Sequence, residues 1–183
     1  MATAPQVETL ESLLDYLDGL TGRPTPEELL PHIQALDLTR EDVAEYVRFS
    51  EDGYQRNLIR AGEHYHALIL CWASGQRSPI HNHPGSICGM RGIEGILTET
   101  VFEPTPCGKL RVSKCQDLPT GGVCVSLDAD THEVANLQEP GRDLITLHVY
   151  SPPLVVMDTF SFSGERIGEI RTSPAGVTTI SGQ

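Results

Sequence analysis

The residues best suited to chemistry lie in one segment, Ser78 to Gly95, which reads SPIHNHPGSICGMRGIEG. His81 and His83 are two positions apart, and Cys88 follows five positions later. Residues two apart on a strand project to the same face, so both imidazoles can bind one metal ion. A third histidine would complete the set. From the residues alone, the candidates are His132, His148 and the pair His64 and His66.

Length, charge and cysteine content limit the class of protein. The 183 residues fit one domain, without a run of ~18 apolar residues that could span a membrane. The acidic N-terminus lacks the basic and apolar regions of a signal peptide. Five irregularly spaced cysteines indicate free thiols in a reducing compartment. A net charge of -12 argues against nucleic-acid and anionic-membrane partners, so we expect a cytoplasmic monomer.

The elements that must position these side chains begin with helices. Leucines between positions 10 and 20 are spaced three and four residues apart, which gives one apolar stripe. Thr25, followed by Pro26, and Thr39, followed by two acids in the first turn, both fit helix N-caps. These short helices are typical of a covering layer, so we expect residues 1–50 to form a helical cover.

From about Tyr65 the pattern changes to short apolar runs bounded by Gly, Pro, Asp or Asn. The runs are ALILCWA, GILTETVF, GGVCVSL, DLITLHVYS and LVVMDTFSF. Helical stretches that would connect parallel strands are missing between them, which favours a mainly β fold. We expect residues 51–171 to form a small antiparallel β-barrel or sandwich, and residues 172–183 to be a loosely held tail.

Glycines around the histidine pair extend the pattern. Gly75 lies six positions before His81, and Gly95 lies twelve positions after His83. This spacing resembles the first motif of the cupin superfamily, whose fold is a small antiparallel β-barrel. Cys88 stands where cupins usually carry a metal-binding glutamate. The resemblance implies a single cupin-type domain over residues 1–183.

The segment GGVCVSLDADTHEVAN resembles part of the second cupin motif. Gly121, His132 and Asn136 fall at the expected spacings. Leu127 and Ala129 replace the usual proline and glycine. Together the two motifs identify His132 as the third ligand.

A set of three histidines without the glutamate has a chemical consequence. Most non-haem iron oxygenases use two histidines and one carboxylate. Three neutral imidazoles leave the charge of Fe(II) uncompensated, so such a site favours an anionic substrate. A thiolate is the obvious candidate.

Several segments together resemble the cysteine dioxygenases of animals, fungi and some bacteria. The matching pieces are YQRNLI, CWASGQRSPIHNHPGSIC, TETVF, His132 and LHVYSPP. In that family three histidines hold iron, and they match His81, His83 and His132. The resemblance also implies a thioether between Cys88 and a ring carbon of Tyr150. Arg56 matches the arginine that binds the substrate carboxylate, and we expect Tyr54 to position it.

The alternation of one predicted strand supports a further role. Thr146, His148 and Tyr150 share one face, so His148 can steer the hydroxyl of Tyr150 instead of binding metal. The family usually has serine at the position of Thr146, and the hydroxyl is kept. No glycine frame surrounds His64 and His66, which we expect to be exposed strand-edge residues.

The resemblance implies an enzyme of cysteine catabolism, a dioxygenase that converts L-cysteine and O2 to cysteine sulfinic acid. Its cofactors would be Fe(II) and the protein-derived Cys–Tyr thioether. One alternative is a dioxygenase of another small thiol such as 3-mercaptopropionate, a subgroup that carries glutamine where Arg56 stands here. The other is a non-catalytic metal-binding cupin, in which Arg56 and the Cys88–Tyr150 pair would have no purpose.

Overall fold

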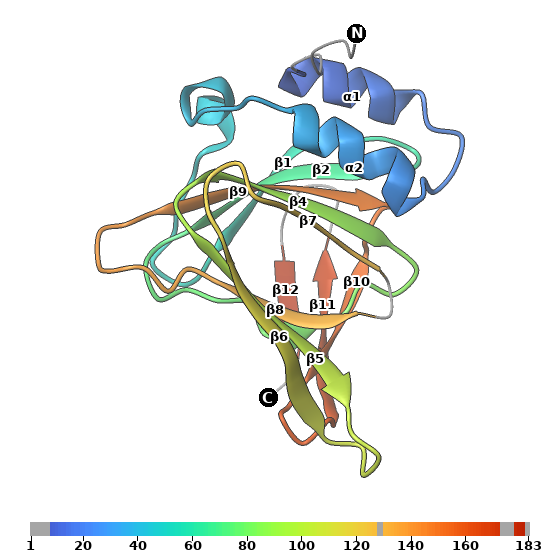
Figure 1. The fold of residues 1–183 in the computed structure, drawn as a ribbon, viewed down its shortest axis with the longest axis vertical. Coiled ribbons are helices and arrows are strands. Elements are labelled where there is room, and N and C mark those ends of the chain that lie inside the picture. The colour runs from blue at the N-terminus through green and yellow to red at the C-terminus, as the bar shows by residue number, and fades with distance from the viewer. Residues whose placement is uncertain (1–7, 128–129, 173–177, 182–183) are drawn as a thin grey trace, which may run out of the picture.

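The computed structural model describes residues 8–127, 130–172 and 178–181, and its fold is mainly antiparallel β (Figure 1). The helices are α1 (Leu10–Asp18), α2 (Pro26–Ala35) and the 3-10 helix η1 (Glu41–Tyr46). The first six strands are β1 (Gln55–Ala61), β2 (His66–Trp72), β3 (Ile80–His81), β4 (Ile87–Glu94), β5 (Leu97–Pro104) and β6 (Leu110–Leu118). The other six are β7 (Val123–Ser126), β8 (Thr131–Ala135), β9 (Leu144–Ser151), β10 (Val156–Phe160), β11 (Arg166–Thr172) and β12 (Thr178–Ser181).

Two antiparallel sheets enclose the interior of the domain. One has five strands in the order β1-β2-β9-β4-β7, and the other has seven in the order β12-β11-β10-β3-β8-β5-β6. Inward-facing apolar side chains from both sheets form one buried cluster, which includes Trp72, Met90, Leu97 and Met157. The predicted cupin-type barrel is confirmed in this arrangement.

Local sequence explains how the helices begin. Thr25 caps α2 as predicted, with its hydroxyl accepting from the backbone N–H of Glu28 and the Glu28 carboxylate accepting from the N–H of Thr25. The α-helix expected after Thr39 is instead the 3-10 helix η1. There the Asp42 carboxylate accepts from both the N–H and the hydroxyl of Thr39, which holds a tight turn. Among the described residues, no helix is long and apolar enough to cross a membrane.

The helices cover the outer face of the five-stranded sheet, above β1, β2, β9, β4 and β7 in Figure 1. Alternate residues of β2, such as Ile69, pack against them, while neighbours such as Leu70 point into the barrel. Both faces of β2 and β9 are therefore buried, which explains why these strands read as nearly continuous apolar runs. Contact is close at Gly89, where an added Cβ would lie 2.2 Å from Cδ1 of Ile33.

A glycine turn takes the chain from one sheet to the other. β4 ends at Glu94 and β5 begins at Leu97, on the opposite sheet. Gly95 lies between them with φ of +84°, and an added Cβ would lie 2.4 Å from the carbonyl oxygen of Asp143. Only glycine fits this corner without strain. Gly95, the last glycine of the first cupin motif, thus allows the chain to turn from one sheet to the other.

The C-terminal segment differs from the expected loose tail. β12 pairs with β11 and forms the edge of the seven-stranded sheet. Backbone pairing thus extends the sheet into residues 178–181, a segment whose Thr- and Ser-rich composition led us to expect a tail. Ala129, one of the two departures from the second cupin motif, lies outside the described residues. The Ser151–Pro152 peptide, directly after β9, is cis.

Candidate metal centre

Three histidines converge inside the barrel. His81 ends β3, His132 lies on β8, and the two are register partners. His83 lies just beyond β3. The ring centroids are 5.0 Å apart for His81 and His83, 4.7 Å for His81 and His132, and 4.9 Å for His83 and His132. One nitrogen from each ring lies within 4.8 Å of the other two, close enough to share an ion.

A turn positions His83, whereas the sequence predicted that both motif histidines share one face of a strand. β3 is only two residues long and ends at His81. Asn82 then bonds Asp158 of β10 in both directions, at 3.3 Å and 3.1 Å. The N–H of Ser86 donates to the carbonyl of His83 at 2.9 Å. These bonds hold the segment of His83 against β10 and in a turn, and its ring still converges with those of His81 and His132.

Hydrogen bonds fix two of the rings with Nε2 left as an acceptor. Nδ1 of His81 lies 2.9 Å from the carbonyl oxygen of Pro79, which can only accept, so this nitrogen carries the proton. Nδ1 of His132 donates in the same way to the Glu99 carboxylate at 2.9 Å. Within the described residues, Nε2 of His132 and both nitrogens of His83 are buried without a hydrogen-bond partner.

Burial keeps the imidazoles of His81 and His83 neutral. It lowers the pKa of His81 to about 3, with a further contribution from His132. Burial, followed by the neighbouring His81 and His132, also lowers the pKa of His83 well below its usual value. Metal ligands must be deprotonated, and buried nitrogens without partners are costly, so the cluster fits a bound metal ion. Imidazole suits zinc, copper, iron and nickel, so the ligands alone do not select iron.

The inward-facing residues of β9 form a hydrogen-bonded row beside this cluster. Nε1 of Trp72 donates to the hydroxyl of Thr146 at 3.1 Å, and that hydroxyl is hydrogen-bonded to Nε2 of His148 at 2.9 Å. Burial, and then Arg56, lowers the pKa of His148 well below its usual value, so the ring is neutral. One nitrogen of the neutral ring carries the proton, and Nδ1 is hydrogen-bonded to the Tyr150 oxygen at 3.3 Å. His148 lies outside the three-histidine cluster.

Arg56 brings a buried cation to the same row. It lies on β1 and is 9% exposed. Its guanidinium carbon is 5.2 Å from the ring centroid of Tyr150, and Nη1 donates to the Tyr150 oxygen at 3.4 Å. Among the described residues no carboxylate forms an ion pair with Arg56, so the guanidinium can receive an anion. Tyr54 stacks on Trp72 at 4.1 Å, which packs both rings at this end of the row.

Cys88 and Tyr150 are neighbours on adjacent strands. They are register partners across β4 and β9, and both are buried. The sulfur lies 3.9 Å from Nδ1 of His148. Burial raises the pKa of the Cys88 thiol to about 12, so the sulfur is protonated and unreactive toward metals or electrophiles unless it is activated.

The second HxH pair is only partly as expected. His64 keeps 30% of its side chain exposed. His66, in contrast, is 7% exposed and is the register partner of Tyr150. The expectation of an exposed edge residue is wrong for His66, because β2 lies between β1 and β9 inside the sheet.

Sequence reasoning gave no role to Glu99, although it lies in the quoted segment TETVF. It is 3% exposed and bonds the ring of His132. The available signal was an acid between two threonines of a predicted strand, where a solvent-facing position is the usual explanation. Only the pairing of β5 with β8 brings Glu99 to His132.

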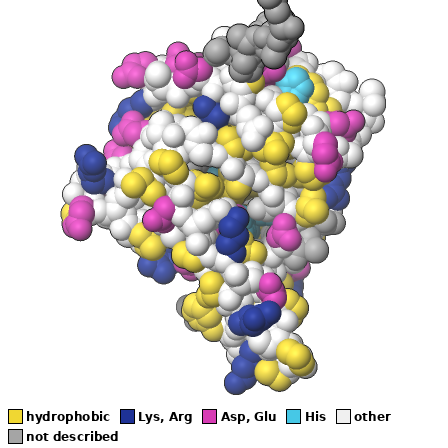
Figure 2. All heavy atoms as spheres, in the orientation of Figure 1, with side chains coloured by type: hydrophobic (Ala, Val, Ile, Leu, Met, Phe, Trp, Pro, Cys, Tyr) yellow, Lys and Arg dark blue, Asp and Glu magenta, His cyan; other side chains and the backbone are white. Residues whose placement is uncertain are grey.

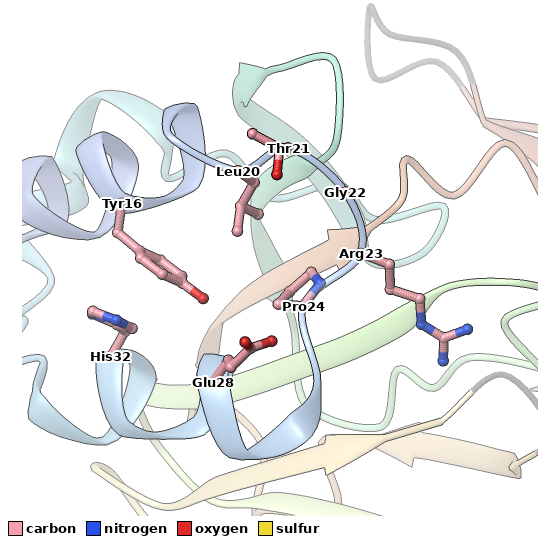
Figure 3. Close-up of a pocket in the computed structure, with 8 residues that line it drawn as sticks. All are labelled: Tyr16, Leu20, Thr21, Gly22, Arg23, Pro24, Glu28 and His32. Carbon is pink, nitrogen blue, oxygen red and sulfur yellow. The ribbon is translucent and has the colours of Figure 1, made fainter.

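A surface hollow beside the helices is another possible site, besides the three-histidine cluster. On the face shown in Figure 2, acidic and basic side chains are interspersed, with hydrophobic ones scattered between them. A hollow of about 450 Å³ lies between α1 and α2 and is lined by Tyr16, Arg23, Glu28 and His32, among others (Figure 3). Its polar groups already serve the fold: Glu28 caps α2, His32 pairs with Glu8 at 2.8 Å, and Arg23 donates to the carbonyl of Gly85.

The fold and the three-histidine cluster define a double-stranded β-helix protein with a candidate metal site. A conserved protein with a double-stranded β-helix domain from Klebsiella pneumoniae superimposes with a TM-score of 0.51 at 19% identity, covering 60% of this chain and 81% of that one. A Thermus thermophilus protein superimposes with a TM-score of 0.52 at 17% identity, covering 61% and 94%. At these identities the likeness concerns the fold alone.

Sequence comparisons identify the family of the chain, which the structural neighbours do not. The family model for cysteine dioxygenase type I matches residues 27–163, and the chain therefore belongs to this family. Cysteine dioxygenase type 1 of Homo sapiens is 31% identical over 138 residues, which cover 73% of this chain and 68% of the human protein. The Danio rerio protein of the same name is 30% identical over 161 residues, which cover 84% and 79%.

Proposed function

We propose that this protein oxidises L-cysteine with O2 to cysteine sulfinic acid at an Fe(II) ion held by His81, His83 and His132. The observation that carries the proposal is Arg56, a buried guanidinium whose Nη1 lies 3.4 Å from the Tyr150 hydroxyl. The ring centroid of Tyr150 in turn lies 5.5 Å from the ring centroid of His83. A site for a small molecule with both a thiol and a carboxylate needs a metal and a cation at such close range.

The reaction balances without a further reductant. The thiol and O2 combine to the sulfinic acid, the sulfur loses four electrons, and both oxygen atoms end on it. Fe(II), when bound, would supply the redox centre that allows O2 to react with a thiolate. The contribution of the chain is to hold the substrate in one orientation in a site shielded from water.

Arg56 is the proposed carboxylate-binding residue. Its planar fork matches a carboxylate, and burial makes that pair stronger than it would be on the surface. The overall charge of -12 gives an anionic substrate no general attraction, so a dedicated cation is needed. Tyr54 and Trp72 would hold the pocket wall near this cation by stacking.

Tyr150 is the proposed hydrogen-bond donor to the substrate. Its oxygen accepts from Arg56 Nη1 at 3.4 Å and lies 3.3 Å from His148 Nδ1, and we propose that His148 donates to it there. The phenol proton is then free to point at the substrate carboxylate or at the reacting oxygen. Burial, followed by the neighbouring Cys88, raises the pKa of Tyr150, which keeps the phenol protonated.

We propose that Cys88 and Tyr150 become joined by a thioether. The new bond would link the sulfur to the ring carbon ortho to the hydroxyl, with loss of one hydrogen from each residue. O2 would accept the two electrons and two protons. The bond would fix the ring of Tyr150 and so hold its hydroxyl in place.

The cellular setting follows from the chemistry. All five cysteines are free thiols, two of them buried and two exposed. A reducing compartment preserves both these thiols and the thiol substrate. We therefore propose a cytoplasmic monomer that acts in cysteine catabolism.

The test is oxygen uptake by the iron-loaded protein with a panel of small thiols, together with metal analysis. L-cysteine should exceed both cysteamine, which lacks the carboxylate, and 3-mercaptopropionate, which lacks the amine. A charge-assisted pair of this kind is worth ~1.5–3 kcal/mol, or roughly ten- to more than a hundredfold in kcat/KM. Arg56→Gln should harm L-cysteine far more than cysteamine, and Arg56→Lys should rescue part of the loss.

Other results would assign the site differently. A preference for 3-mercaptopropionate would identify the protein as a dioxygenase of that thiol. Iron binding without oxygen uptake on any thiol would identify a non-catalytic metal-binding cupin. Equal losses on L-cysteine and cysteamine in Arg56→Gln would mean that Arg56 supports the fold and not the substrate.

A further inference from the structure

Glu99 is a carboxylate inside the barrel. It lies on β5, two residues from Leu97 of the apolar interior, and is 3% exposed. Burying an ionised carboxylate is unfavourable unless hydrogen bonds and a nearby positive charge compensate for the lost hydration. The surroundings of Glu99 must therefore supply both the hydrogen bonds and the positive charge.

The hydrogen bonds come from neighbouring strands. Oε1 accepts from Nδ1 of His132 at 2.9 Å, with the Ser126 hydroxyl at 3.5 Å and the Cys124 thiol at 3.7 Å as longer contacts. Oε2 accepts from the side-chain amide of Gln116 at 2.7 Å. Every donor points at the carboxylate, so the site is built for an acceptor that carries negative charge.

The positive charge is not supplied by a lysine or arginine. Within the described part of the chain, the only ion-pair partner of Glu99 is His132. Nδ1 of that ring faces the carboxylate, and the buried Nε2 on its other side has no partner. A cation bound at Nε2 would therefore be the charge that balances Glu99, with the imidazole between them.

We propose that Glu99 is a positioning and charge-balancing residue of the metal centre, a role that rests on the proposed function. Its carboxylate holds the proton of His132 on Nδ1 and orients the ring. Its negative charge also offsets the charge that three neutral imidazoles leave on the ion. In the first cupin motif of this chain, Cys88 replaces the usual metal-binding glutamate, and a negative charge is lost from the ligand set. Glu99 supplies a negative charge in its place, from a position outside the ligand set.

The matched control is Glu133, the residue after His132 on β8. Because neighbouring strand residues face opposite ways, Glu133 points away from the metal centre. It lies 3.5 Å from Arg77 and keeps 19% of its side chain exposed. Glu133→Gln removes the same charge, from the strand that carries His132, without touching the network around Glu99.

The experiment measures Fe(II) binding under anaerobic conditions by competition with a chelator, for the unsubstituted protein, Glu99→Gln, Glu99→Ala and Glu133→Gln. Partners outside the ligand set are typically worth about 10- to 100-fold in metal affinity. Glu99→Gln keeps an acceptor but loses the charge, so we expect about tenfold weaker binding, with a larger loss for Glu99→Ala. Glu133→Gln should bind iron as the unsubstituted protein does.

Two readouts separate this role from a structural one. The metal-free melting temperature of Glu99→Gln should be unchanged or higher, because a buried uncompensated anion is gone. The midpoint potential of the bound iron should rise in Glu99→Gln, since Fe(III) loses more stabilisation than Fe(II), and it should not move in Glu133→Gln.

Unchanged iron affinity and potential in Glu99→Gln would overturn the role of Glu99 while leaving the metal centre intact. A large drop in the metal-free melting temperature of Glu99→Gln, with an unchanged potential, would make Glu99 a structural residue. Failure of the unsubstituted protein to bind iron would overturn the metal centre itself, and with it the role of Glu99.

Discussion

Cys88 and Tyr150 stand directly opposite each other across β4 and β9, although 62 positions separate them in the chain. Opposed residues of an antiparallel pair have Cβ atoms about 4.5–5.5 Å apart, so the sulfur and the phenol ring are held within reach of one another. His148 contacts both, with Nδ1 at 3.9 Å from the sulfur and at 3.3 Å from the phenol oxygen. This register is the structural basis of the proposed thioether.

The first prediction is that the crosslink accumulates with turnover. Iron-loaded protein supplied with L-cysteine and O2 should lose the mass of two hydrogen atoms, and the internal loop should make it run faster on a denaturing gel. Cys88→Ser should lack the faster band and retain reduced activity, because the three histidines and Arg56 remain. Cys107→Ser, which removes an exposed thiol, should behave as the unsubstituted protein.

Peptide mapping identifies the bond directly. After turnover, one peptide should contain Cys88 joined to Tyr150. Recovery of both residues only in separate, unmodified peptides would contradict the prediction, and Cys88 would then be an ordinary buried thiol of the pocket.

The second prediction distinguishes His132 from His148, two inward-facing histidines that were both candidates for the third metal ligand from the residues alone. His132→Ala should lose iron and activity together, because it removes one of three ligands. His148→Ala should keep its iron and lose activity, because its ring contacts Tyr150 and lies outside the cluster. Metal content per chain, measured beside oxygen uptake, checks both. Full iron in His132→Ala, with loss in His148→Ala, would exchange the two assignments.

The third prediction concerns the stability of the metal-free protein in acid. His81 has a folded-state pKa of about 3, against ~6.5 in an unfolded chain. The unfolded state therefore binds more protons between these values, so stability is fully present above pH ~6.5 and is lost as the pH falls toward 3. Each such group contributes ~1.4 kcal/mol per pH unit in this window.

Urea unfolding in the presence of a chelator at pH 7 and pH 5 measures the effect. The unsubstituted protein should be less stable at pH 5, and His81→Gln should show a loss smaller by about 2 kcal/mol, because one titrating group is gone. Burial also lowers the pKa of His83 and His148, which accounts for the slope that remains. An equal pH dependence in both proteins would refute the buried, neutral state of His81.

Features that depend on local sequence could be predicted. The cap at Thr25 follows from the spacing of Thr25 and Glu28. The strands β2 and β9 can be recognised as apolar runs because both of their faces are buried. β6 could not be recognised in this way, since its residues are mostly exposed and it is a strand only through pairing with β5.

The candidate site also combines features that local sequence predicts with features that depend on strand pairing. The HxH motif and the second cupin motif identify three histidines, and the structure brings them together. The turn that aims His83 and the approach of Glu99 to His132 depend on contacts between distant strands. His66 is buried for a similar reason, because its strand lies inside the sheet. Such contacts leave no periodic signal in a single sequence.

The last prediction tests how closely the helical cover fits the sheet that carries the site. Gly89 on β4 faces α2, and an added Cβ would lie 2.2 Å from Cδ1 of Ile33 and 3.1 Å from Cδ2 of Leu29. Gly89→Ala should therefore destabilise the protein by ~1–3 kcal/mol through overpacking. Ile33→Val removes Cδ1 and by itself should cost ~0.5–1.5 kcal/mol by opening a small cavity.

Combined, the two changes should be less harmful than their sum, because the new methyl group occupies the space that Cδ1 leaves. A double-mutant cycle from urea unfolding of the four proteins measures this coupling, which is expected to be ~0.5–3 kcal/mol for residues in contact. Gly19→Ala paired with Ile33→Val is the control, since Gly19 is the C-cap of α1 and its added Cβ would meet backbone oxygens of that helix only. Additive losses for Gly89 and Ile33 would mean that α2 moves away from β4 to admit the methyl group. The cover would then be a loose layer, and the position of Cys88, the residue before Gly89, would not depend on it.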